Sequence, residues 1–475
     1  MRFRGYFYLW LLVLVFCSLY ATMGRLLGFV RPEILNSLFF GAEGWWTLPT
    51  AVHGVAAVVQ GTVLALLGRW FYRNFGLPRR GDRRLLLVLF IVLGLVLCLN
   101  QFGELKNVVS GTTDFGTILQ AAQAVRAGED PYAATSNGYF YPPVLAFLLI
   151  GLTWLPPAGA STLFFSGKIL MVLWVLLACD RLADGGRFRG GIRTLFLFGL
   201  VFVGARFWIT DLQFGNTNVL ILFLMLAAVH GSLNDRQTWA GIALALAFTI
   251  KLIPGILVLF FLLNHRWRAL AWFAAGTLAL ILLPWLIQPA SWWHTWGWYF
   301  DAGVTGKLGE RLAQPDNQSV WGLLNRIFPA TPLTTLRLLW LATGLLLTAL
   351  AGWVTRQTRH LAAPAPLVGA SLFMLVGLLM SPGSWVVHYT ATLPALVALW
   401  RIALGGRRHA FYWAVFAVAN FAFTVSGWAR ALVAPSIEQS WFVLAVLLLV
   451  VALGVWGWRG SISGSQIPGT GRAQP

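Results

Sequence analysis

A single acidic residue, Asp114, begins the stretch 114-DFGTILQAAQAVRAGEDPYAATSNGYFYPP-143, which interrupts a chain otherwise composed of long apolar runs. It is the only acid between Glu104 and Glu129. The longer apolar runs on either side reach roughly 17 to 20 residues, enough for a helix to cross a hydrocarbon core of about 30 Å. A lone carboxylate beside such helices is a candidate general base or a candidate helix cap.

The composition is that of an all-α polytopic membrane protein, with 58% hydrophobic and only 10% charged residues. The net charge of +19 could also indicate a nucleic-acid partner. However, the Lys and Arg residues lie in short clusters between apolar runs and form no stripe. Such clusters are typical of membrane topology, so the lipid bilayer is the expected partner and nucleic acid is not.

The apolar runs predict about fourteen transmembrane helices. The positive-inside rule places both termini in the cytoplasm, because most Lys and Arg then fall in cytoplasmic segments. Most Asp and Glu fall on the outer face in this threading, so acid–base chemistry is expected there. The predicted spans are residues 7–23, 51–70, 85–101, 160–179, 194–209, 219–233, 239–251, 254–264, 270–287, 335–354, 367–380, 385–400, 411–427 and 441–458.

Three regions follow from this threading. Residues 1–84 form an additional N-terminal transmembrane hairpin with a basic cytoplasmic loop. Residues 85–458 form the main membrane domain, with a first outer loop at 102–159 and a second at 288–332. Residues 459–475 are rich in Gly and Ser and form a disordered cytoplasmic tail. Long loops in compact proteins tend to be functional, so both outer loops are candidate site regions.

The first outer loop predicts a short amphipathic helix along the membrane surface. Apolar residues recur at helical spacing after Asp114, and Gly128 followed by Pro131 supplies a stop. The apolar run at 144–155 is too short to span the membrane comfortably, so it is expected to be re-entrant or interfacial.

The chain lacks the motifs of nucleotide-driven enzymes, since it has no P-loop and no Gly-x-Gly-x-x-Gly after a strand. A transferred group would then arrive in another form, such as an activated lipid in the bilayer. No Asp-x-Asp occurs, and Cys17, Cys98 and Cys179 lie in or at the end of apolar runs without metal-ligand spacing. We therefore expect no metal site and no cofactor.

Five motifs in order carry a resemblance to a known family. They are Asp114-Phe115 with 121–132 and Tyr141-Pro142-Pro143; 213-QFGNTN-218; 251-KLIP-254 with 266-RWR-268; 317-NQS-319; and 381-SPGSW-385 with His388-Tyr389. Together they cover about residues 114–400 and resemble glycosyltransferase family 87, the polyprenyl-phosphate-mannose-dependent α-mannosyltransferases of GT-C fold. The chain departs from that pattern by its N-terminal hairpin and by one histidine, His388, where relatives often have two adjacent.

The resemblance implies an inverting hexosyltransferase. It would move mannose from a polyprenyl-phosphate donor to a glycolipid or polysaccharide acceptor at the outer face of the inner (plasma) membrane. Asp114 would be the general base that deprotonates the acceptor hydroxyl. The alternative for Asp114 is a helix cap, and the alternative function is a lipid-linked sugar flippase or transporter. A transporter would be expected to show paired broken helices, whereas the break at Pro254 has no clear counterpart.

The remaining site residues follow from the same motifs. Lys251 is expected to bind the donor phosphate, or else to snorkel to the interface, and Arg206 to bind phosphate or pair with Asp211. His388 is a candidate catalytic or phosphate-binding residue, or an interface residue. The candidate sugar- and acceptor-binding residues are Tyr141, Gln213, Asn216, Asn218, Asn317, Gln318 and Trp385, with a helix N-cap as the alternative for Asn216.

An aromatic group in the second outer loop completes the candidates. Its members could stack on sugar faces or form an interfacial belt, and the belt is the preferred interpretation. They are Trp292, Trp293, Trp296, Trp298 and Tyr299.

The threading predicts which loops an impermeant maleimide can reach in intact cells. Gly111→Cys, Gly309→Cys and Gly383→Cys, each in a background without the three native cysteines, are expected to react. Gly185→Cys is expected to react only after permeabilisation, because it lies in a basic cytoplasmic segment. Labelling at position 185 before permeabilisation would contradict the threading.

Overall fold

The computed structural model describes residues 113–463, with gaps at 136–137, 185–195, 197–199, 201–204, 291, 302–311, 315–316, 405–409 and 425–439. The predicted spans 7–23, 51–70 and 85–101, most of 194–209 and the N-terminal hairpin lie outside the described residues. Within the described part of the chain every regular element is a helix, as the composition predicts.

The long helices include five that are long and apolar enough to cross a membrane among the described residues. They fall in α7 (Pro157–Ala183), α13 (Trp267–Ile287), α17 (Leu333–Thr358), η5 (Val386–Thr392) joined to α19 (Leu393–Leu404), and α22 (Trp441–Ser463). The protein is therefore an integral membrane protein by the length and composition of its helices. Helix α22 continues to Ser463, beyond the predicted end of the last span at residue 458.

Several predicted spans are instead short helices that pack inside the bundle. Helix α10 (Asn218–Leu233) has 16 residues and α11 (Gln237–Ile250) has 14, so each is only about 21 to 24 Å long. The predicted span 254–264 is a 3-10 turn, η3 (Ile253–Ile256), followed by the single short helix α12 (Leu257–Leu263). The break that Pro254 predicts is thus present, because its ring cannot continue an α-helix.

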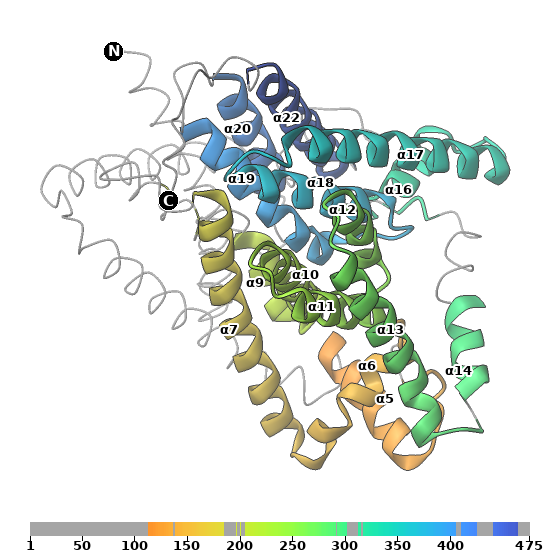
Figure 1. Ribbon diagram of the computed structural model, residues 1–475. Coiled ribbons are helices and arrows are strands. Elements are labelled where there is room, and N and C mark those ends of the chain that lie inside the picture. The colour runs from red at the N-terminus through yellow and green to blue at the C-terminus, as the bar shows by residue number, and fades with distance from the viewer. Residues whose placement is uncertain are drawn as a thin grey trace, which may run out of the picture.

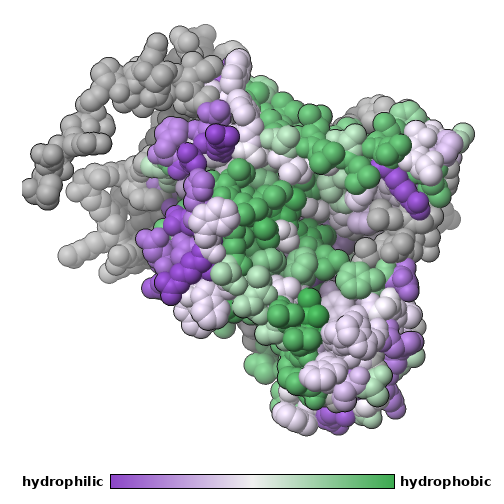
Figure 2. All heavy atoms as spheres, turned by 45° about the vertical axis from the view of Figure 1, so that its right-hand side comes forward, coloured by the Kyte–Doolittle hydropathy of each residue, from purple (hydrophilic) through white to green (hydrophobic). Residues whose placement is uncertain are grey.

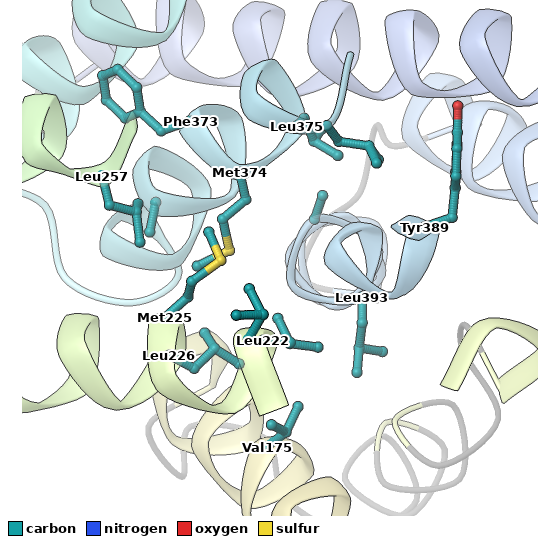
Figure 3. Packing of buried hydrophobic residues seen from close by; sticks show 14 of the residues in the cluster. Val175, Leu222, Met225, Leu226, Leu257, Phe373, Met374, Leu375, Tyr389 and Leu393 are labelled. Carbon is teal, nitrogen blue, oxygen red and sulfur yellow. The ribbon is translucent and has the colours of Figure 1, made fainter. Parts of the chain in front are cut away.

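Helix α10 and α18 (Ala365–Met380) form the centre of the hydrophobic core. Helix α18 carries buried residues on every side and α10 on all but one narrow stripe, which is typical of helices packed among others. Figure 3 shows Met225 of α10 and Met374 of α18 meeting between Leu222 and Leu257. The polar residues of α10 lie near its ends, and the helix begins at Asn218.

Close helix packing depends on a small residue where α11 crosses α13. A Cβ on Gly241 would lie 2.3 Å from the carbonyl oxygen of Ala269, so no larger side chain fits there. Small residues at such crossings let two helix backbones approach. This contact fixes α11, and with it the position of Lys251 directly after the helix.

The first outer loop folds as α5 (Asp114–Ala127), α6 (Pro143–Leu148) and η2 (Ile150–Trp154). Helix α5 ends where expected, at Gly128, whose φ of 82° is left-handed. The helix was predicted correctly, but its predicted position along the membrane surface is wrong. Residues on most sides of α5, such as Phe115, Ile118 and Leu119, are buried. It is enclosed by α6, η2 and neighbouring helices, and α6 and η2 are too short to span, as predicted for 144–155.

The two outer loops pack together at one end of α7 and α13 (Figure 1). The Gln288 side chain donates to the Val125 carbonyl at 3.0 Å, and His294 lies 3.7 Å from the Asp130 carboxylate. Trp298 of α14 (Trp292–Trp298) stacks on Tyr132 with ring centroids 4.1 Å apart. The two predicted outer loops thus form one layer at this end of the bundle.

The aromatic group of the second loop serves this packing more than an interfacial belt. Trp292, Trp296 and Tyr299 are buried, whereas Trp293 is exposed. The Trp292 indole donates to the Ile281 carbonyl at 2.9 Å. Only the exposed Trp293 retains the surface position that a belt requires.

Charged side chains at the predicted cytoplasmic ends pair with one another. Asp184 after α7 lies 3.0 Å from Arg401 of α19, and Asp235 lies 3.2 Å from Arg266. Residues that the threading assigns to one side therefore do lie together. Figure 2 shows hydrophobic side chains over the centre of one face and hydrophilic ones gathered at its edges, as a membrane-embedded bundle requires.

The other described helices complete the bundle. Their bounds are α9 (Ala205–Phe214), α16 (Val320–Ile327) and α20 (Ala410–Thr424).

Candidate active site

Three elements meet at the candidate site: the start of α5, the turn between α9 and α10, and the end of α11. The turn contains Gly215 with a φ of +66°, and a Cβ at this position would lie 2.7 Å from the Cβ of Phe115. Only glycine combines this backbone conformation with so close an approach. Gly215 therefore brings the turn against the start of α5 and places Asn216 beside Asp114.

Asp114 does not cap α5, because Thr113 occupies that position. The Thr113 hydroxyl accepts the Gly116 N–H at 3.2 Å, and Asp114 is the first helical residue. The Asp114 Oδ2 atom instead accepts a hydrogen bond from the Asn216 amide at 2.6 Å. The helix-cap alternative for Asp114 is thus excluded by the geometry of α5.

Burial raises the pKa of Asp114 above its ordinary value of 3.8, and the Asn216 hydrogen bond acts against this rise. Among the nearby charges, Asp211 raises the pKa, while Lys251 and Lys168 lower it. A carboxylate with a raised pKa is a stronger base than an exposed one. The dipole at the N-terminus of α5 would by itself lower the pKa of Asp114, because it favours the charged carboxylate.

A line of three side-chain hydrogen bonds runs from Asp114 to Lys251. Asn216 donates to Asp114, the Asn218 amide donates to the Asn216 oxygen at 2.6 Å, and Lys251 Nζ donates to the Asn218 oxygen at 2.8 Å. Lys251 follows α11 in an extended conformation and is half-buried. It is thus held inside the polar cluster instead of extending to an interface.

Lys168, which lies within α7 in the predicted span 160–179, was not among the predicted site residues. Its ammonium is 1% exposed and lies 2.8 Å from the Asp211 carboxylate, which is 0% exposed. It also donates to the carbonyl oxygens of Asp211 and Asn216 at 3.0 and 2.6 Å. A charge in the middle of an apolar span usually marks a functional site, so the signal was present in the sequence.

Asp211 binds the first N–H groups of α10, which excludes the N-cap alternative for Asn216. Its carboxylate accepts the N–H groups of Asn218 and Val219 at 2.9 and 3.2 Å, so Asn216 is not the N-cap of α10. It forms its ion pair with Lys168, a partner that the sequence did not suggest. The side chains of Arg206 and Gln213 lie outside the described residues.

An apolar cavity begins at this cluster. Asn218, Lys251 and His388 line it together with Ile221, Leu222, Met225, Ile253, Met374, Leu378 and Ala391. His388 is 8% exposed, and its Nδ1 atom accepts the Trp385 N–H at 2.9 Å. A neutral imidazole that accepts at Nδ1 carries its hydrogen on Nε2, so His388 is suited to donate to an anion.

Tyr141 lies near the other end of the cluster, beside Thr217 and Asp114. Burial, and secondarily the Asp114 carboxylate, raise the pKa of Tyr141 well above its usual range. The hydroxyl therefore stays protonated, as a hydrogen-bond donor should. Tyr132 supports it by donating to the Tyr141 carbonyl at 2.9 Å.

Asn317 and Gln318 are engaged in holding the second outer loop. The Asn317 amide donates to the carbonyls of Leu312 and Pro382 and accepts from the Ser319 hydroxyl and the Ser384 N–H. These four bonds use its full capacity, which leaves none for a sugar.

Gln318 accepts the Phe442 N–H with its side chain, and its carbonyl accepts the Tyr389 hydroxyl. The two residues thus support the segment that carries Trp385 and His388. Trp385 is partly exposed, and its ring centroid lies 5.5 Å from that of His388.

The fold and this site define a class of protein, namely helical membrane proteins in which a polar cluster leads from a carboxylate to an ammonium beside an apolar cavity. Residues 139–382 match the model of glycosyltransferase family 87. The chain belongs to this family.

Two relatives from Mycobacterium tuberculosis illustrate the similarity. A polyprenol-phosphate-mannose-dependent α-(1-2)-phosphatidylinositol mannoside mannosyltransferase is 27% identical over 66% of this chain and 75% of its own length. A pentamannoside mannosyltransferase of the same donor dependence is 26% identical over 80% and 88%. The crystal structure of ArnT from Cupriavidus metallidurans with undecaprenyl phosphate matches with 15% identity and a TM-score of 0.42, over 80% of this chain and 79% of that one. This last likeness is too weak to carry an argument.

The buried ion pair yields a prediction about stability and activity. Lys168→Met leaves the Asp211 carboxylate buried without its ammonium, which is expected to cost about 3–5 kcal/mol and to lower the melting temperature in detergent. Lys168→Met with Asp211→Asn removes the stranded charge, so much of the stability returns. Transfer activity stays low, because the turn that carries Asn216 is no longer held.

Arg401→Met is the matched control, since it breaks the remote pair with Asp184. It is expected to lower stability while each folded molecule keeps its transfer activity. Wild-type activity in the Lys168→Met, Asp211→Asn double variant would contradict a role for this pair in arranging the site.

Proposed function

We propose that the protein transfers mannose from a polyprenyl monophosphate to a hydroxyl of a glycolipid or polysaccharide acceptor at the extracytoplasmic face of the inner (plasma) membrane. The observation that carries this proposal is one polar cluster with Asp114 at one end and Lys251 at the other. Lys251 also lines an apolar cavity. A base and a phosphate-binding cation are the two groups that this reaction requires.

The small cavity at Lys251 marks a place where the charged head of a donor would meet apolar side chains. Its lining combines Lys251 and His388 with side chains such as Leu222, Met225 and Met374. The ammonium binds a phosphate as a point charge, and the His388 Nε2–H donates to a phosphate oxygen. The isoprenoid chain then extends into the apolar environment of the membrane, where its burial is favourable.

The transfer step follows from the two ends of the cluster. Asp114 takes the proton of the acceptor hydroxyl as its oxygen bonds to the anomeric carbon. The bond between that carbon and the phosphate oxygen breaks, and its electron pair leaves with the polyprenyl phosphate. Lys251 and His388 stabilise the charge that develops on the leaving group. Attack opposite to the phosphate inverts the anomeric centre.

The other site residues have supporting roles in this proposal. Tyr141 and Trp385 contact the acceptor or the transferred sugar, through a neutral hydroxyl and a partly exposed indole. Asn317 and Gln318 act indirectly, by supporting the segment of Trp385 and His388. We assign Asn216 and Asn218 to Asp114 and Lys251 and not to sugar hydroxyls.

The mannose assignment rests on the activities of the two relatives described above, both of which depend on polyprenol-phosphate-mannose. A flippase would need no general base, whereas burial gives Asp114 the raised pKa of one. We therefore prefer transfer to transport.

Replacement of the base tests this function. Asp114→Asn keeps the size of the side chain but removes its basicity, so transfer from polyprenyl-phosphate-mannose is expected to fall by about 10²- to 10⁴-fold. The melting temperature in detergent should change little. Asp130→Asn is the matched control, because Asp130 lies in the same outer loop and binds only Tyr132 and His294 among the contacts described. Retention of more than about a tenth of the activity by Asp114→Asn would exclude this residue as the base.

A further inference from the structure

Asn216 and Asn218 lie in the same orientation between two opposite charges. Each amide directs its NH₂ group toward Asp114 and its oxygen toward Lys251. An ammonium can only donate and a carboxylate can only accept, so the reverse orientation would lose the bonds at both ends. The polarity of this pair of amides, the amide relay, is thus fixed by the charges that it joins.

Hydrogen bonds that involve the backbone of the turn also fix the position of the amide relay. The Asn216 oxygen accepts the Thr217 N–H at 2.7 Å in addition to the Asn218 amide. Lys168 holds the Asn216 carbonyl, and Asp211 holds the Asn218 N–H. Because these contacts are buried, the two amides keep their orientation when the groups at either end change their charge.

Hydrogen bonds in such a line strengthen one another. Donation by Lys251 polarises the Asn218 amide, which becomes a better donor to Asn216, and Asn216 becomes a better donor to Asp114. The relay therefore stabilises the carboxylate form of Asp114 as long as the Lys251 ammonium donates to Asn218. A phosphate bound at Lys251 would compete for that charge.

The charges of the proposed reaction move along the same line. Asp114 changes from a carboxylate to a neutral acid as it takes the acceptor proton. The donor changes from a phosphodiester with one negative charge to a phosphomonoester with up to two. One unit of negative charge thus leaves the Asp114 end and arrives at the Lys251 end.

We propose that the amide relay couples the two ends, so that donor phosphate at Lys251 makes Asp114 a stronger base. This inference rests on the proposed function. Asn216 and Asn218 are positioning residues in it, since they act on the base and on the cation and take no part in bond making. The enzyme would hold a weaker base until a donor is bound, and a stronger one in the complete complex.

The direction of the effect follows from the charged groups around Asp114. Lys251 and Lys168 favour its carboxylate form, Asp211 opposes it, and the Tyr141 hydroxyl is neutral. Lys168 already faces Asp211, whereas a donor phosphate would face Lys251. A negative charge at Lys251 offsets part of the positive charge that favours the carboxylate form of Asp114, so the pKa of Asp114 rises.

Rate profiles against pH test the coupling. Activity requires the carboxylate form, so the rate rises with pH through the pKa of Asp114. With saturating acceptor, the pH dependence of kcat/KM for polyprenyl-phosphate-mannose reports the pKa of Asp114 in the enzyme without donor. The pH dependence of kcat reports the pKa of Asp114 in the complex with donor. In the wild type the acid limb of kcat is expected at higher pH than that of kcat/KM. The gap should be on the order of one pH unit, as for one charge acting at an intermediate dielectric.

Asn218→Leu breaks the relay and is expected to reduce this gap by at least half while an acid limb remains. Asn218→Ser is the second variant, because its short hydroxyl is unable to bridge Asn216 and Lys251 even if the leucine variant folds poorly. Asn234→Ser is the matched control at the other end of α10, where Asn234 donates to the His230 carbonyl, and it should keep the wild-type gap.

The outcomes separate this inference from the proposed function. An unchanged gap in a folded Asn218 variant, or no gap in the wild type, would overturn the coupling and leave Asp114 as the base. An acid limb and normal activity in Asp114→Asn would instead overturn the proposed function itself. A gap that is present in the wild type and reduced in the Asn218 variants alone supports the relay.

Discussion

The candidate site depends on one buried ammonium. Lys168 reaches from α7 into the turn between α9 and α10 and binds the Asp211 carboxylate and two backbone carbonyls of that turn. Its three N–H donors match these three acceptors, so it organises the turn much as a bound cation would. The same turn carries Asn216 and Asn218, and Asp211 caps the helix that begins there. Without this pair, the Asn216 carbonyl and the first N–H groups of α10 would lose the partners described here.

The bundle around the site explains why such a polar cluster is tolerated. It lies at the start of α10, a helix that is enclosed by others and is shorter than a membrane is thick. Charges in this position contact protein groups and not lipid, and each is matched by an opposite charge or an amide. A low local dielectric then strengthens every one of these contacts, which is what a site for moving charge requires.

The sequence predicted the helical membrane class and most helix bounds in the described part, because apolar periodicity and Pro or Gly stops are local signals. It also identified Asp114 and Lys251, since an isolated acid in an outer loop and a charge at the end of an apolar span are visible in one dimension. It could not reveal that Asn216 and Asn218 join them, because 102 positions separate Asn216 from Asp114.

Long-range pairing accounts for the main errors as well. The ion pair of Asp211 with Lys168 was not predicted, because it depends on how α7 packs against α9. The enclosure of α5 likewise comes from elements that follow it in the chain. The N-cap role expected for Asn216 belongs to Asp211, which reaches α10 from the preceding helix.

The central claim is that a lipid phosphate binds at Lys251, at the far end of the cluster from Asp114. A cryo-EM structure of the protein with polyprenyl phosphate tests it most directly. The account predicts a phosphate oxygen about 3 Å from Lys251 Nζ and near His388. A phosphate bound elsewhere, with Lys251 and the apolar cavity unchanged, would contradict it.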